Sequence, residues 1–186
     1  GPHFFYADLY GCAATSAPTL QPPPAPTNAP EVSTLCARAS IVGMLQCNQE
    51  PTLTRCYKKT ADGASSDVWH AKCDGKGPTI TVMKGSSGYT FGGYTSVSWQ
   101  KPGGIVFSST PDATAFLFTD TNRSAGRACQ FEKKTLLRSS DAIRQSRDYG
   151  PAWGSGPDLM TSVQGKMTTV TSQTGSYYMS QNAFGN

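Results

Sequence analysis

The sequence predicts a mainly β protein with short flanking helices (α+β), in which two antiparallel sheets pack as a two-layer sandwich. Residues 79–83 alternate in the manner of a strand, and residues 89–99 continue with aromatic and β-branched side chains. The Gly-Ser-Ser-Gly at residues 85–88 is typical of a tight turn, so the two stretches predict a hairpin. Residues 114–119 are almost continuously apolar, which indicates a strand buried inside the sandwich.

Two glycines lie in the second strand of this predicted hairpin. Gly92 and Gly93 have no side chains to pack, which predicts either a β-bulge or a backbone that lies close against a neighbour. Residues 53–59 also have the composition of a strand. These features predict that the sheet extends to the N-terminal side of the hairpin.

Two stretches have the pattern of short helices. In residues 31–46, Ser33 or Thr34 is a candidate N-cap and apolar residues follow at helical intervals. A second helix is predicted over residues 67–72, with Ser65 or Ser66 as its cap and with glycines following it. The second helix is expected to pack against the sheet.

The remaining part of the chain is less regular. Residues 101–111 are expected to form a loop, and residues 150–157 a tight glycine-rich connection that lacks the ending of a phosphate-binding loop. Residues 160–178 return to Thr, Val, Ser and Tyr, which predicts one or two further strands. Residues 127–137 give no clear pattern.

The N-terminal residues predict a strand that is separate from the domain. The aromatic and apolar side chains in residues 1–12 favour a strand in need of a partner. Residues 13–31 form a proline-rich linker of the extended type, and residues 32–186 form the folded domain. The Thr and Pro residues of the linker also suit O-glycosylation. The residues of the predicted self-assembly strand are Phe4, Phe5, Tyr6, Leu9 and Tyr10.

Composition and charge limit the function classes. The chain has 186 residues, is 37% hydrophobic and has a net charge of +4, which allows one sizeable core plus an extension. Basic residues are scattered and form no stripe with stacking aromatics, so we expect no nucleic-acid partner. No apolar run approaches the ~20 residues that span a bilayer, and the first residues lack a signal-peptide pattern. The protein is therefore expected to be either cytoplasmic or already processed.

Cysteine usage favours export. The cysteines are widely spaced without any C-x-x-C pair, so we expect neither a metal site nor a bound cofactor. An even set without metal spacing favours disulfides and thus an extracellular or cell-surface location, and Asn122 begins an N-glycosylation acceptor sequence. The pairing is left open among 15 possibilities. The disulfide candidates are Cys12, Cys36, Cys47, Cys56, Cys73 and Cys129.

One cluster raises the question of catalysis. His70 and Cys73 are three residues apart and can share a helix face, which is compatible with a nucleophile pair. Disulfide bonding of Cys73 and capping of the helix by Asp74 explain the same residues and are favoured. No G-x-S-x-G segment and no obvious pair of acid and base carboxylates is present. We therefore predict no catalytic residues and no enzyme activity.

Several ordered motifs resemble the TLDc domain. They are the Phe-Gly-Gly-Tyr of residues 91–94, the Ala-Phe-Leu-Phe of residues 115–118, and the segments 149–151 and 154–159. The similarity extends over about residues 53–160 and implies a sandwich with a helix over one mouth. It implies no established reaction. Cytosolic members of the family are associated with protection against oxidative damage and with regulation of the vacuolar proton pump.

The resemblance also bears on assembly. TLDc domains generally end in an acidic and hydrophobic closing strand beyond a segment like residues 175–178. No such strand follows here before Asn186, so the resemblance implies a gap in the sandwich. We expect the N-terminal strand of one copy to fill the gap in the next, giving a head-to-tail homopolymer or filament. The alternatives are an intracellular regulator of TLDc type and a monomeric extracellular binding module.

Overall fold

The architecture comes from a computed structural model of the chain. It describes residues 4–10, 43–45, 53–84, 90–103, 107–120, 131–135, 139–154, 158–163 and 166–171. All structural statements below refer to these residues.

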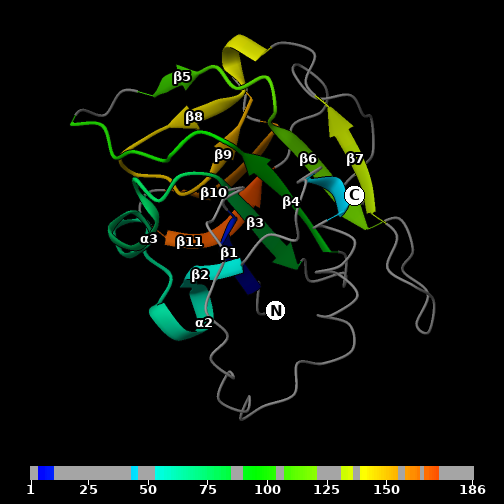
Figure 1. Ribbon diagram of the computed structural model, residues 1–186. Helices are drawn as coiled ribbons and strands as arrows, with labels where there is room; N and C mark the ends of the chain where they lie inside the picture. The colour runs from blue at the N-terminus through cyan, green and yellow to red at the C-terminus, as the bar shows by residue number, and fades with distance from the viewer. Residues whose placement is uncertain are drawn as a thin grey trace, which may run out of the picture.

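Two antiparallel sheets form the body of the protein (Figure 1). The first sheet has the strand order β2 (Leu53–Lys58), β1 (Phe4–Tyr10), β3 (Thr79–Lys84), β4 (Thr90–Thr95), β6 (Phe116–Asp120) and β7 (Phe131–Thr135). The second has the order β11 (Lys166–Thr171), β10 (Leu159–Val163), β9 (Ala152–Trp153), β8 (Ile143–Gln145) and β5 (Ser108–Thr110). Helices α2 (Lys59–Asp62) and α3 (Ser66–Cys73) and the 3-10 turn η1 (Ser139–Asp141) complete the described elements.

The predicted hairpin is confirmed. β3 pairs antiparallel with β4, and β6, the predicted buried strand, pairs with the other side of β4. β4 ends at Thr95 instead of continuing to Trp99. The reason lies in Ser96, whose backbone N–H donates to the carboxylate of Asp112 at 2.7 Å and so leaves the strand ladder. The turn predicted at residues 85–88 lies outside the described residues.

Gly92 and Gly93 allow close approach, and they do not form a bulge. The register between β3 and β4 runs without a shift through both residues. A Cβ on Gly92 would lie 1.8 Å from the carbonyl oxygen of Thr81, and a Cβ on Gly93 would lie 2.5 Å from the ring of Trp153. Gly92 therefore allows β3 to approach, and Gly93 makes room for a side chain of the second sheet.

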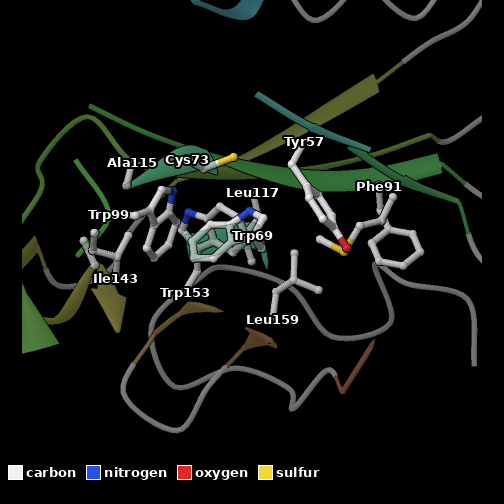
Figure 2. Packing of buried hydrophobic residues seen from close by; sticks show 12 residues of the cluster. Tyr57, Trp69, Cys73, Phe91, Trp99, Ala115, Leu117, Ile143, Trp153 and Leu159 are labelled. Atoms are coloured by element: carbon white, nitrogen blue, oxygen red, sulfur yellow. The ribbon is translucent and has the colours of Figure 1, made fainter. Parts of the chain in front are cut away.

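The main core lies between the two sheets (Figure 2). Its centre is a row of three buried tryptophans, in which the ring centroids of Trp69 and Trp99 are 5.5 Å apart and those of Trp99 and Trp153 are 5.4 Å apart, both edge to face. Two ring N–H groups find acceptors: Trp99 donates to Thr79 and Trp153 to the carbonyl oxygen of Tyr94. The buried members of this core are Tyr57, Trp69, Cys73, Met83, Phe91, Trp99, Ala115, Leu117, Ala142, Ile143, Trp153 and Leu159.

A second apolar cluster covers the other face of the first sheet. It consists of Ile80, Phe116 and Phe118, with Met44 and Leu45 packed against them. Gly43 and Met44 are helical, and these residues belong to the predicted helix of residues 31–46, most of which lies outside the described residues. Both faces of the sheet are therefore apolar, which explains the nearly continuous apolar run of β6.

Helix α3 confirms the second helix prediction. It begins after Ser65, whose side chain makes no capping hydrogen bond, and its buried residues include Trp69 and Cys73. Beyond the helix, Gly75 and Gly77 adopt φ angles of 68° and 82°, a backbone conformation that glycine tolerates best. The helix therefore ends where the glycines were expected to end it.

The irregular parts of the sequence contain more strands than predicted. The expected loop of residues 101–111 contains β5, which pairs with β8. Residues 131–135 form β7 although they show no strand pattern, and the connection at residues 150–157 contains the short strand β9. Prediction of one or two strands in residues 160–178 is confirmed by β10 and β11. β5, β7 and β9 have only three, five and two residues, too few for a period to be seen.

No helix in the part of the chain that the structure describes is long and apolar enough to cross a membrane.

Candidate functional site

The N-terminal strand occupies a slot inside the first sheet. β1 lies between β2 and β3 and pairs antiparallel with both, so its backbone is hydrogen-bonded along both edges (Figure 1, dark blue). Opposite positions of β1 and β3 include Phe5 with Met83 and Ala7 with Thr81. Ala7 is also opposite Tyr57 of β2. Tyr57 and Met83, the partners of these positions, belong to the core between the sheets.

The slot brings together segments that are far apart in the sequence. Residues 11–52 separate β1 from β2, while β2 and β3 are joined through the two short helices. β2 is at the margin of the first sheet, and its neighbour in the strand order is β1. The backbone pairing of β2 with the sheet therefore depends on β1.

β2 has a β-bulge at Cys56. Ala7 is opposite Tyr57 and Asp8 is opposite Arg55, so Cys56 is the extra residue of β2 at this point. An extra residue of this kind bends the strand and redirects a side chain. In this sheet it allows both Cys56 and Tyr57 to contact the core between the sheets.

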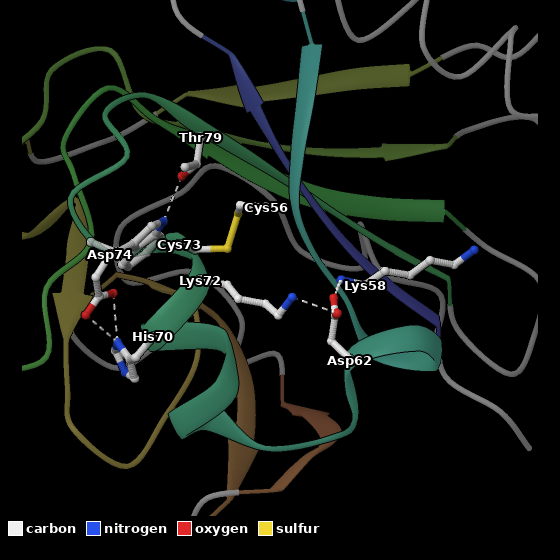
Figure 3. The surroundings of a disulfide bond; sticks show 9 residues. Cys56, Lys58, Asp62, His70, Lys72, Cys73, Asp74 and Thr79 are labelled. Carbon is white, nitrogen blue, oxygen red and sulfur yellow. Dashed lines mark hydrogen bonds and ion pairs between the residues drawn. A yellow bond between two sulfur atoms is a disulfide. The ribbon is translucent and has the colours of Figure 1, made fainter. Parts of the chain in front are cut away.

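Cys56 is joined to Cys73 by a disulfide (Figure 3). The bond connects the bulge of β2 with the last residue of α3, and the Cα atoms are 5.4 Å apart. Cys73 is 1% exposed, so the bond is at the edge of the core. The other four disulfide candidates, Cys12, Cys36, Cys47 and Cys129, lie outside the described residues, as does Asn122.

Further contacts hold β2 near the helices. The Tyr57 side chain is fully buried, and burial together with the nearby Asp62 carboxylate raises the pKa of its phenol to about 12. The phenol remains protonated and donates to the carbonyl oxygen of Gly63. Asp62 accepts hydrogen bonds from Lys72 and from the backbone N–H of Lys58, and these lower the pKa of its carboxyl group.

His70 connects α3 with the segment before β9. Its Nδ1 is 2.8 and 3.0 Å from the two carboxylate oxygens of Asp74, and its Nε2 is 2.9 Å from the carbonyl oxygens of Ser146 and Tyr149. All four partners are oxygen acceptors. The imidazole of His70 therefore joins Asp74 of the helix end to the backbone of Ser146 and Tyr149.

These contacts bear on the possible nucleophile pair of His70 and Cys73. A thiolate is required for nucleophilic attack, and the sulfur of Cys73 is bonded to Cys56. Both nitrogens of His70 are engaged by Asp74 and by backbone carbonyls. Cys73 is therefore a disulfide cysteine, as predicted. Asp74 is the C-cap residue of α3, and its carboxylate is bound to His70. Within the described ranges, no group of three His, Cys, Asp or Glu side chains is arranged to hold a metal ion.

The sequence predicted a strand in residues 1–12 but not the two strands that it pairs with. That strand was expected to fill a gap in another copy, left by a missing closing strand, whereas β1 pairs with β2 and β3 of its own chain. The strand pattern of residues 53–59 was the available signal for one wall of the slot. Pairing partners were not visible because strand order depends on contacts between distant residues.

The fold and the slot define a class of protein: a small two-sheet sandwich with an inserted N-terminal strand and a helix fixed to its edge. The TLDc domain family matches residues 33–185, so the chain belongs to the TLDc-domain family. Domains of this family are in general regulatory or binding modules. Searches of curated proteins and of solved structures gave no significant match.

Proposed function

We propose that this protein is a non-catalytic structural or adhesive subunit that assembles into a head-to-tail homopolymer by exchanging β1 between copies. In the assembly, β1 of one copy occupies the slot between β2 and β3 of the next. The registers described above would be retained, because the donor and the acceptor have the same sequence.

The observation that carries the proposal is the place of β1 in the sheet. An interior strand contributes two full rows of backbone hydrogen bonds, and residues 11–52 leave its covalent attachment remote from the slot in sequence. The slot recognises a backbone, as in other cases of strand addition, and the alternate side chains determine specificity. A second copy therefore has everything that the slot requires.

Pairing within one chain competes with pairing between chains. A tether raises the local concentration of β1 at its own slot to an extent that depends on the length and stiffness of the linker. The sequence of residues 13–31 predicts a linker made semi-rigid by prolines. When the span of such a linker does not match the distance from β1 to its own slot, the local concentration of β1 at that slot is lower. Assembly is then favoured at high protein concentration.

The proposal also includes an extracellular location and the lack of catalysis. The disulfide between Cys56 and Cys73 is compatible with an oxidising compartment. Titration of the denatured protein tests the location: no reactive thiol is expected, and six would indicate a reducing compartment and favour an intracellular regulator of TLDc type. Glycans on the linker and on Asn122 belong to the same proposal.

A cross-link between donor and acceptor strands tests the assembly. Ala7 and Thr81 are opposite each other, and opposite positions of antiparallel strands are within reach of a disulfide. The double variant Ala7→Cys/Thr81→Cys is concentrated, oxidised and separated by non-reducing denaturing electrophoresis. A ladder of covalently joined chains is expected, together with filaments in negative-stain electron microscopy.

The single variant Ala7→Cys is the matched control, since it lacks the second thiol and should produce no such ladder. A double variant that is fully oxidised and yet migrates as one monomer band, without filaments, would refute the exchange of β1.

The second candidate function is a monomeric extracellular binding module. The pairing of β1 with β2 and β3 of its own chain favours it. It predicts the single monomer band in the cross-linking experiment and a molecular mass that does not change with concentration in light scattering.

A further inference from the structure

The edge strand β2 depends on β1 for its backbone pairing with the first sheet. Among the described strands, β2 follows only β1 in the order of the first sheet, so removal of β1 breaks all of its ladder hydrogen bonds. β3 is in a different situation, because its other edge remains paired with β4. Of the two walls of the slot, only β2 needs another means of support.

We infer that the disulfide between Cys56 and Cys73 keeps β2 in place while the slot is empty, and so holds the slot open for an incoming β strand of this sequence. The inference rests on the proposed function, because it concerns the same slot, and it assigns a positioning role to the two cysteines.

The position of the disulfide supports this role. It leaves β2 at Cys56, the extra residue of the bulge, and it is a side-chain bond that takes no part in the backbone ladder. The other end of the disulfide is Cys73 of α3, about one helical turn after two residues that fix this helix to the rest of the protein. Trp69 packs in the core, and His70 is bonded to the carbonyl oxygens of Ser146 and Tyr149 (Figure 3 shows the cysteines and His70).

The chain of contacts therefore runs from β2 to the second layer of the protein. From Cys56 it passes through the disulfide to α3, and from α3 through His70 to the segment between β8 and β9. None of these contacts involves β1. They persist when β1 leaves, and a preorganised slot binds its strand without the entropy loss of ordering β2 again.

The Tyr57 ring packs in the core between the sheets, and the hydrogen bonds at this end of β2 are local. Asp62 accepts from the backbone N–H of Lys58, and the phenol of Tyr57 donates to Gly63, but both partners lie in the turn that directly follows β2. The ion pair of Lys72 with Asp62 also reaches α3, and the Lys72 side chain is 45% exposed, where such pairs contribute little. Lys72 therefore provides a matched control for the disulfide.

The test measures how the full-length protein binds a fluorescent peptide with the sequence of residues 3–11. Wild type, Cys56→Ala/Cys73→Ala and Lys72→Ala are compared by fluorescence anisotropy, each in a chain that also carries Ala7→Pro, so that its own β1 no longer competes for the slot. The apparent Kd of the double alanine variant is expected to rise by about tenfold or more, since a flexible β2 must be ordered on binding. Lys72→Ala should bind as the wild type does.

Hydrogen exchange of the same variants distinguishes a local effect from general unfolding. Loss of protection in the double alanine variant is expected in residues 53–58 and not in β4 or β6. Loss of protection throughout β4 and β6 would mean that the disulfide supports the entire sandwich, and would overturn the inference.

The peptide experiment also separates this inference from the proposed function. Equal affinities for wild type and double variant would overturn the role of the disulfide and leave strand exchange intact. Absence of binding to both would refute an exchangeable slot, and with it both proposals.

Discussion

The carboxylate of Asp112 accepts hydrogen bonds both from the end of β4 and from the segment before β6. Its side chain is buried, and its carboxylate accepts from the hydroxyl groups of Thr95, Ser96 and Thr114 and from the backbone N–H groups of Ser96 and Thr114, at 2.7–3.0 Å. It thereby fixes the end of β4 to the segment that leads into β6. A single carboxylate therefore connects these two segments where the backbone hydrogen bonds of the sheet have ended.

Protonation of Asp112 should destabilise the protein. Burial raises the pKa of this carboxyl, but the hydrogen bonds from Thr114, Thr95 and Ser96 outweigh it, so the pKa lies below its ordinary value. A carboxyl whose pKa is lower in the folded state stabilises the fold above about pH 4, and this contribution is lost as the pH falls through the folded pKa. We expect Asp112→Asn to lower the free energy of unfolding by about 2 to 3 kcal/mol at pH 7, and by much less in strong acid.

Urea denaturation at pH 7 and pH 3 measures both effects, with Asp67→Asn as the control. Asp67 pairs with Lys101, but its side chain is 74% exposed and the pair is screened by solvent, so its loss should change stability little. A deficit of Asp112→Asn that remained the same at both pH values would contradict the role of the charge.

At the scale of elements, two adjacent glycines determine how closely β4 packs against its neighbours. Gly92 faces the Thr81 carbonyl and the ring of Phe118, and Gly93 faces the ring of Trp153. The second contact places a strand of the first sheet directly against β9 of the second. The pair thus determines both the spacing of neighbouring strands and the packing of the two layers.

Substitution of Gly92 by alanine should therefore separate β3 from β4. A Cβ at 1.8 Å from a backbone oxygen cannot be accommodated by a side-chain rotation, and we expect a loss of about 3 kcal/mol in the free energy of unfolding. Thermal and urea denaturation measure it. In Gly103→Ala, the control, the added Cβ has nothing within 4 Å and should be tolerated. Similar stabilities of the two variants would show that the register of this hairpin is wrong.

At the scale of the whole molecule, β1 connects the strands of the first sheet. β1 joins β2 to the remainder of the first sheet, so a local change in residues 4–10 affects an element on the far side of a long connection. This long-range dependence holds whether β1 comes from the same chain or from another copy. It makes the N-terminal segment part of the fold instead of an appendage.

Ala7→Pro tests this dependence. Proline lacks the N–H that an interior strand must donate and is excluded from the middle of sheets, so we expect a loss of about 3 kcal/mol or more in the free energy of unfolding. Hydrogen exchange should show the loss of protection in residues 53–58 first. Ala7→Val keeps the N–H and serves as the control. If Ala7→Pro were as stable as the wild type, β1 would not be an interior strand.

The sequence alone determined the elements whose signal is local. Alternation and turn residues identified the hairpin, an unbroken apolar run identified β6, and glycines marked the end of α3, because each depends on neighbours within one element. The ordered motifs from Phe91 to Leu159 identified the family in the same way. Tertiary structure alone decided which strands flank β1, that Cys73 bonds to Cys56, and that His70 reaches Ser146 and Tyr149. These facts join residues that are far apart in sequence, and the free energy that selects such pairings comes from the packing of the complete core, which no single stretch of sequence contains.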